Sequence, residues 1–203
     1  MYTIVGNPKN RSLRVMWALE ELGQDWALET VAPQTERMLA VNATGKAPVL
    51  LVDGAPIPDS VAIVTFLADR HGALTFPAGS LERGRQDAIT QFCVDELEGA
   101  CWTAAKNGFL HPEDKRSDVK ATCAWEFELA QKRLETLLGE GPWVMGETFT
   151  VADILIAHTL SWGDRMFQWP LTDTLADYKQ RAMSRPALGA AMAKGKALLE
   201  AAA

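Results

Sequence analysis

Cysteine, tyrosine and histidine are all scarce in this chain, and their scarcity excludes several kinds of chemistry. Three cysteines among 203 residues, Cys93, Cys101 and Cys123, are too few and too odd in number for a disulfide framework. We expect them to be reduced and mostly packed thiols. The three histidines have no metal-ligand spacing among themselves or with the cysteines, so the sequence predicts no metal site.

Long apolar runs and blocks of positive charge are also missing. No window of about 18 apolar residues is present, so we expect no membrane span. The N-terminus, MYTIVGNPKN, lacks the charged start, apolar run and cleavage site of a signal peptide. The net charge is −6, and the lysines and arginines are spread along the chain, which argues against a nucleic-acid partner. These features together predict a cytoplasmic protein.

What the chain does contain is apolar material for a core, 48% of its residues. In residues 1–75, short apolar runs alternate with amphipathic stretches that end in Gly23 and Gly72. We expect strands and helices in the order β-α-β and then β-β-α, with a polar connection at residues 33–37. The expected strands are 2–6, 26–31, 49–52 and a short run after the Asp53–Gly54 turn; the expected helices are 12–23 and 60–72.

The character of the sequence changes after residues 76–84, a glycine-containing segment that we interpret as a linker. Beyond it the pattern predicts helices only, at 83–105, 117–138, 150–167, 174–184 and 186–199. One start is especially well marked, because Thr150 and Asp153 form the S/T-x-x-D variant of a capping box. Phe149 and Ile154 stand at the two positions of a hydrophobic staple. The sequence therefore predicts an α/β domain at 1–75 and an all-α domain at 85–203.

Four motifs in this order and spacing give the chain a resemblance to a known family. They are NPKNRSLRVMWALEELG, NATGKAPVL, PDSVAIVTFLADRHG and GETFTVADILIA. The chain resembles the cytosolic glutathione S-transferase superfamily, as a bacterial-type member, over essentially its whole length. The resemblance implies a thioredoxin-like N-terminal domain that binds glutathione, followed by a C-terminal helical-bundle domain. It also implies a homodimer, a role in detoxification and an apolar electrophile as the second substrate.

The resemblance assigns roles to residues of the second and third motifs. It implies a cis Ala47–Pro48 bond, with the Ala47 backbone pairing with glutathione as an added strand would. Ser60 is a good N-cap, and a helix N-terminus is an anion site, so Ser60 with Asp59 would hold the γ-glutamyl carboxylate. Lys46 and Arg37 are candidate partners for the glycyl carboxylate, although either could equally be a solvated surface charge.

The reaction that the resemblance implies is attack of the glutathione thiolate on an electrophilic carbon. Ionising the thiol at neutral pH requires a pKa shift of roughly 2 units, or about 2.7 kcal/mol, which one well-placed donor nearly supplies. The first loop has neither the Tyr nor the Cys that some members use, since Tyr2 lies inside the first strand. The candidates are therefore Asn10 and Ser12. We favour Asn10, whose amide carries N–H donors, over Ser12, for which capping the helix is an alternative role.

The second substrate and the competing functions are less defined by the sequence. Trp102, Lys106, Phe109 and Trp162 are candidates for the electrophile pocket, although aromatic residues at such spacing also suit a plain core. Another glutathione-dependent reaction, such as that of a peroxidase, an isomerase or a dehalogenase, fits the same residues. A non-catalytic interaction or regulatory protein of the same fold is an alternative. A redox protein that uses Cys101 is a third possibility, disfavoured by the lack of Cys in the first loop.

Overall fold

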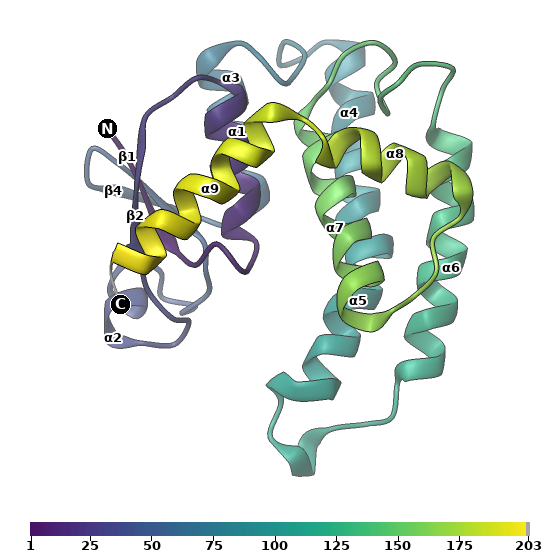
Figure 1. Cartoon of the computed structure of the whole chain (residues 1–203), viewed down its shortest axis with the longest axis horizontal. Coiled ribbons are helices and arrows are strands. Elements are labelled where there is room, and N and C mark those ends of the chain that lie inside the picture. The colour runs from purple at the N-terminus through teal and green to yellow at the C-terminus, as the bar shows by residue number, and fades with distance from the viewer. Residues whose placement is uncertain (202–203) are drawn as a thin grey trace. The chain divides into compact units, whose positions relative to one another are not determined.

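The computed structural model describes residues 1–201, which fall into two compact units. The first unit combines Met1–Ala78 with the segment that starts at Ser184, and the second is Gly79–Met183. The boundary at Ala78 lies inside the expected linker. None of the helices within residues 1–201 has the length and apolar character that a membrane span requires. Figure 1 labels the α-helices and most strands of the two units.

A four-stranded sheet forms the centre of the first unit. Its strands are β1 (Tyr2–Gly6), β2 (Trp26–Thr30), β3 (Val49–Val52) and β4 (Ala55–Pro58). The sheet order is β2-β1-β3-β4, with β1 parallel to β2 and antiparallel to β3. This mixed sheet and its helices confirm the expected β-α-β and β-β-α order. Register pairs Ile4 with Leu50 and Val5 with Val49, so alternate positions of both strands carry apolar side chains to opposite faces.

Helices cover both faces of this sheet because each face is apolar. They are α1 (Ser12–Glu21), α2 (Glu36–Val41), α3 (Ser60–His71) and α9 (Pro186–Ala201). Met38 of α2 packs with Val5 and Val49, while α1 and α3 pack against each other on the side of Ile4. The sequence predicted only a polar connection around α2. This short helix was missed because Met38 is its only buried side chain.

The C-terminal helix α9 belongs to the first unit, which differs from the expected helical domain of residues 85–203. It packs along α1 and against β2 and buries Leu188, Ala191 and Gly195. A bidentate ion pair from Arg185 to Glu21 of α1, with N–O distances of 2.6 and 2.7 Å, precedes it. The sequence pattern gave the helix correctly, but a helical pattern alone does not identify the surface on which a helix packs.

The second unit consists of helices joined by loops, and the loop at residues 138–150 contains two isolated bridges. Its elements are α4 (Leu81–Phe92), η1 (Cys93–Leu97), α5 (Glu98–Ala105), η2 (Lys106–Leu110), η3 (Glu113–Lys115), α6 (Lys120–Leu137), α7 (Val151–Phe167) and α8 (Asp173–Met183). The stretch expected as one helix at 83–105 is interrupted at η1, a π-helical segment, and η2 is a second such segment. The core is apolar and includes α7. Cys93, Cys101 and Cys123 are all buried, and none of them forms a disulfide within residues 1–201.

The start of α7 has the capping box that the sequence predicted. Asp153 accepts hydrogen bonds from the backbone N–H of Thr150 at 2.7 Å and of Val144 at 2.9 Å. The Tyr178 hydroxyl of α8 donates to the same carboxylate at 2.5 Å. Burial raises the pKa of Asp153, and the donors of Tyr178, Val144 and Thr150 oppose that rise. One carboxylate thus fixes the helix start and ties it to a neighbouring helix.

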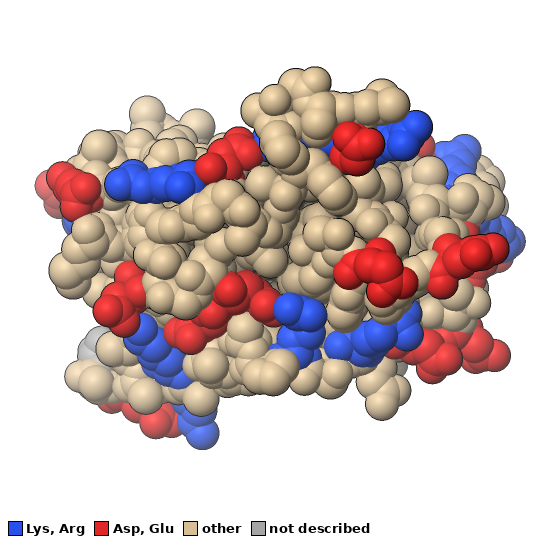
Figure 2. All heavy atoms as spheres, turned by 90° about the horizontal axis from the view of Figure 1, so that it is seen from above, with Lys and Arg blue, Asp and Glu red and all other residues tan. Residues whose placement is uncertain are grey.

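Charged side chains of both signs are mixed on the surface. On the face that Figure 2 shows, lysine and arginine side chains are interspersed with aspartate and glutamate. Several of them form ion pairs within a unit, including Lys132 with Glu128 and Lys179 with Asp164. The visible face therefore carries no broad field of one sign.

Candidate functional site

Asn10 and Ser12 lie together where the loop after β1 enters α1. The Asn10 Oδ1 atom accepts hydrogen bonds from the Ser12 backbone N–H at 2.8 Å and from the Ser12 hydroxyl at 2.7 Å. Because a backbone N–H can only donate, the oxygen of the Asn10 amide must face Ser12 and its NH₂ group faces away. Ser12 is the first residue of α1 and not its N-cap, which is Arg11 without a side-chain cap.

Ser12 is completely buried, and its hydroxyl is engaged on both sides. Besides donating to Asn10, it accepts a hydrogen bond from the Asn7 backbone N–H at 3.2 Å. The hydroxyl lies against the backbone of Gly6, where an added Cβ would come within 2.2 Å of the Ser12 Oγ and 3.7 Å of the Ala47 Cβ. The glycine at the end of β1 therefore lets Ser12 and Ala47 approach each other.

The Ala47–Pro48 bond is cis, in agreement with the resemblance. Within residues 1–201, the N–H and C=O groups of Ala47 form no backbone hydrogen bond. The preceding turn is held by the Asn42 amide, which donates to the Lys46 carbonyl at 2.8 Å. The Lys46 side chain is exposed, and its ammonium makes no ion pair within the described residues. A peptide edge and a free cation thus lie next to each other in sequence.

Arg37 has a partner of its own in this structure. Its guanidinium donates to both carboxylate oxygens of Glu29 on β2, at 2.6 and 2.7 Å. These hydrogen bonds are the main cause that lowers the pKa of Glu29. Of the two cations that the sequence suggested for the glycyl carboxylate, Lys46 is unpaired and Arg37 is engaged.

The beginning of α3 differs from the expectation at one position, because Asp59 and not Ser60 is its N-cap. The Asp59 carboxylate accepts hydrogen bonds from the N–H groups of Val61 at 2.9 Å and Ala62 at 3.1 Å. Its backbone has φ +75°, a conformation that residues with a side chain rarely adopt and that often marks functional sites. A serine cap at position 60 would require a β-region backbone at that residue. The Asp59 carboxylate instead reaches both amides, and Ser60 is the first residue of the helix.

Ser60 is buried, and it receives a hydrogen bond from a residue that the sequence did not suggest. Nη1 of Arg14 on α1 donates to Ser60 Oγ at 3.4 Å, and the Arg14 side chain is completely buried. A buried guanidinium directly beneath a helix N-terminus strengthens the positive potential there. The pattern of α1 gave no signal for this role, because Arg14 stands beside the apolar positions of an amphipathic helix.

The candidates for the electrophile pocket lie on the second unit and are only partly brought together. Trp102 of α5 and Trp162 of α7 contact each other with ring centroids 6.5 Å apart. Trp162 also contacts Phe167, at 6.3 Å. Lys106 follows Trp102 by one helical turn, since its N–H donates to the Trp102 carbonyl. Phe109 lies in η2 and is 52% exposed, apart from this aromatic group.

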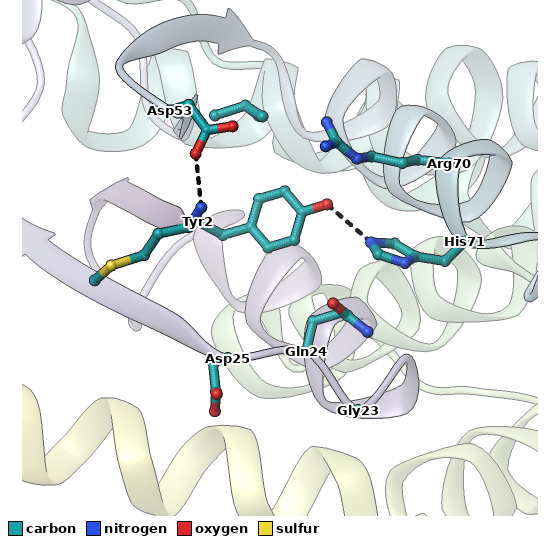
Figure 3. Close-up of a pocket in the computed structure, with 9 residues that line it drawn as sticks. Tyr2, Gly23, Gln24, Asp25, Asp53, Arg70 and His71 are labelled. Atoms are coloured by element: carbon teal, nitrogen blue, oxygen red, sulfur yellow. Dashed lines mark hydrogen bonds and ion pairs between the residues drawn. The ribbon is translucent and has the colours of Figure 1, made fainter.

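A separate cavity of about 380 Å³ in the first unit contains none of the predicted site residues (Figure 3). Next to it the Tyr2 hydroxyl lies 2.8 Å from His71 Nε2, and the Met1 ammonium donates to Asp53 at 2.8 Å. Its lining comes from the start of β1, the loop before β2, the β3–β4 turn and the end of α3: Met1, Tyr2, Gly23, Gln24, Asp25, Val52, Asp53, Arg70 and His71. The candidate residues Asn10, Ala47 and Ser60 do not line this cavity.

Comparison with known proteins agrees with the arrangement of the first unit. Residues 10–70 match the family model of the glutathione S-transferase N-terminal domain. Glutathione S-transferase GstA of Escherichia coli O157:H7 is 27% identical over 180 residues, which cover 83% of this chain and 86% of that protein. The chain is therefore similar to glutathione S-transferases in its N-terminal domain and along most of its length. Its matched segment contains Asn10, the Ala47–Pro48 turn and the start of α3.

Solved structures of glutathione S-transferases extend this likeness to most of the chain. A sphingomonad glutathione S-transferase complexed with glutathione is 29% identical, with a TM-score of 0.78 over 96% of this chain and 98% of that one. The beta-class enzyme of Sphingomonas chungbukensis is 26% identical, with a TM-score of 0.79 over 95% and 98%. A glutathione transferase of Methylococcus capsulatus is 27% identical, with a TM-score of 0.78 over 97% and 99%.

Proposed function

We propose that this protein is a glutathione S-transferase that binds glutathione along the Ala47 edge, ionises its thiol beside Asn10 and transfers the thiolate to an electrophilic carbon. The observation that carries the proposal is the orientation of the Asn10 amide. Its oxygen is taken by Ser12, so its NH₂ donors are left for a ligand at the start of α1. A donor in that place stabilises a thiolate more than a thiol, which lowers the thiol pKa.

Ser12 fits the role of thiol activator less well than Asn10. Its hydroxyl proton is directed to Asn10 Oδ1, and the side chain has no exposed surface. A hydroxyl that donates elsewhere offers a sulfur atom no hydrogen bond. We therefore assign Ser12 to positioning Asn10, and Asn10 to the sulfur.

The two ends of glutathione fit different parts of the first unit. The γ-glutamyl carboxylate fits the start of α3, where Ser60 and the buried Arg14 meet and where the helix dipole favours an anion. Asp59 shapes this end as the N-cap and can accept from the γ-glutamyl ammonium. The glycyl carboxylate fits Lys46, whose ammonium is unpaired within residues 1–201, while Arg37 reaches it only by leaving Glu29.

The remaining roles follow from the same proposal. Trp102, Lys106 and Trp162 supply surface for the electrophile, with Phe109 at the margin. The protein works in the cytoplasm as a homodimer, with glutathione as co-substrate and no metal.

The experiment that tests the proposal is an ultraviolet titration of glutathione bound to the purified protein. A saturable thiolate band that persists below pH 7 is expected, because the free thiol titrates near pH 8.5. Binding without that band would reject thiol activation and favour a binding role for the fold. No saturable binding would reject the proposal as a whole.

A further inference from the structure

One lysine of the second unit has no counter-charge within the described residues and stands one helical turn after a tryptophan. Lys106 is half-buried at the start of η2, and its ammonium makes no hydrogen bond or ion pair within residues 1–201. Lys132 on α6 and Lys179 on α8, in contrast, are paired with carboxylates. A lysine ammonium with no acceptor on its own chain gains free energy when an anion forms a charge-assisted hydrogen bond with it. The position of Lys106 is thus suited to an anion that is not part of the chain.

The aromatic side of the same surface is formed by two tryptophans. Lys106 and Trp102 lie four residues apart on one helical run, so they share a face. The Trp102 ring contacts Trp162 of the adjacent α7 with an angle of 55° between the ring planes, and both tryptophans are half-buried. Half-buried indole rings offer a flat apolar surface on which another planar ring can pack. Trp102 and Trp162 therefore form a surface for stacking, and the unpaired Lys106 follows Trp102 by one helical turn.

The neighbouring α6 provides no ion pair to Lys106. Burial raises the pKa of the Cys123 thiol on α6, the Glu126 carboxylate raises it further, and the Lys106 ammonium opposes both. Lys106 is therefore close enough to α6 to act on Cys123. Glu126 is exposed, and within the described residues it forms no ion pair with Lys106. The charge of Lys106 is left for a group that arrives from solution.

We propose that the electrophile of this enzyme is an aromatic compound that carries a carboxylate, with its ring on Trp102 and Trp162 and its carboxylate on Lys106. This inference rests on the proposed transferase function and narrows the electrophile from any apolar compound to an aromatic acid. An ammonium–carboxylate hydrogen bond is stronger than a bond between neutral groups. An uncharged analogue cannot form this charge-assisted hydrogen bond with Lys106, so Lys106 stabilises its binding less.

A suitable probe is 4-chloro-3-nitrobenzoate, with 4-chloro-3-nitrobenzamide as its uncharged counterpart. In either reaction the thiolate attacks the ring carbon that carries chlorine, a C–S bond forms, and the C–Cl bond breaks. Chloride leaves with the bonding electron pair, and the proton of the glutathione thiol goes to the solvent. No oxidant or reductant is needed. The two probes share their reacting carbon and differ in the charge of the substituent para to it.

The test measures the ratio of kcat/KM for the acid to kcat/KM for the amide. We expect Lys106→Met to lower this ratio by about 10-fold or more, as expected for the loss of one hydrogen bond to a charged group. Lys106→Arg keeps the charge and should keep the ratio within about 2-fold, a rescue that also shows the site is intact. Lys132→Met removes an exposed lysine of α6 that is paired with Glu128, and should leave the ratio unchanged.

A second measurement separates this inference from the transferase proposal. Quenching of tryptophan fluorescence by each probe, without glutathione, gives the acid-to-amide binding ratio, which we also expect to fall in Lys106→Met. If the wild-type protein turns over neither probe but this binding ratio falls, the aromatic-acid site stands and the transferase proposal fails. If Lys106→Met has the same ratio as the wild type in turnover and in binding, Lys106 does not select an anion and the inference is overturned.

Discussion

At the scale of single residues, Asn10 and Ser12 share hydrogen bonds but differ in what remains available to a ligand. Replacing Asn10 by alanine removes the NH₂ donor, and the thiol pKa of bound glutathione should rise by about 1–2 units, given 1.5–3 kcal/mol for a hydrogen bond to a charged group. Ser12→Ala removes one of the two hydrogen bonds that position Asn10, but the Ser12 backbone N–H still donates to the Asn10 oxygen, so this variant should keep the thiolate band. The ultraviolet titration of bound glutathione measures both variants.

Asn10→Asp is the matched control for this pair. It keeps an acceptor for the Ser12 N–H but replaces the NH₂ donor with a carboxylate oxygen, so it should also lose the thiolate band while the protein stays folded. If Ser12→Ala loses the thiolate band and Asn10→Ala keeps it, then Ser12 and not Asn10 activates the thiol.

At the scale of single elements, the start of α7 depends on one buried carboxylate. Asp153→Asn leaves too few acceptors for the donors of Thr150, Val144 and Tyr178, which should lower the free energy of unfolding by about 1–3 kcal/mol. Because the folded-state pKa of Asp153 is raised, its titration favours the folded state fully below the unfolded pKa, near pH 4, and that contribution is lost as pH rises through the folded pKa.

The stability gap between the wild type and Asp153→Asn should therefore widen as the pH falls from 7 toward 4. Urea unfolding of both proteins at several pH values gives the gap, and the titrations of the other carboxylates largely cancel in the difference. A gap that narrows toward acid pH would mean that the donors outweigh burial and that the pKa of Asp153 is lowered.

The same element shows how much of the fold the sequence could predict. The start of α7 depends on residues within one turn of each other, so Thr150 and Asp153 were sufficient to locate it. The cap of α3 was predicted one residue late, because the choice of Asp59 depends on a backbone with positive φ that the sequence does not reveal. Asn10 and Ala47 could be nominated from the motifs, whereas Arg14 could not, since its contact with Ser60 joins two helices 46 positions apart.

At the scale of the whole molecule, the C-terminal segment supports the loop that holds Asn10. Helix α9 lies along α1, and an added Cβ at Gly195 would come within 3.3 Å of the Pro8 Cγ and 3.4 Å of the Met16 Sδ. Pro8 stands two residues before Asn10. The sequence predicted helix α9 but placed it in the all-α domain. The small residues of α9 permit close packing, but they do not identify the helix against which α9 packs.

This contact predicts that the far end of the chain controls glutathione binding. Gly195→Leu should force α9 away from Pro8 and Met16, and overpacking of this kind costs about 1–3 kcal/mol, partly offset by about 1 kcal/mol of helix propensity. Gly189→Leu is the matched control in the same helix, since a Cβ there meets nothing within 4 Å. Urea unfolding and the Kd for glutathione measure the two effects.

We expect Gly195→Leu to bind glutathione more weakly and to lose part of the thiolate band, because displacement of Pro8 moves the Asn10 amide. Gly189→Leu should bind as the wild type does and be slightly more stable, as its side chain adds helix propensity without a clash. If both variants bind and ionise glutathione equally well, α9 stabilises the first unit without positioning its loop. The predicted difference between two glycines of one helix therefore tests whether the last element of the chain holds the first loop in place.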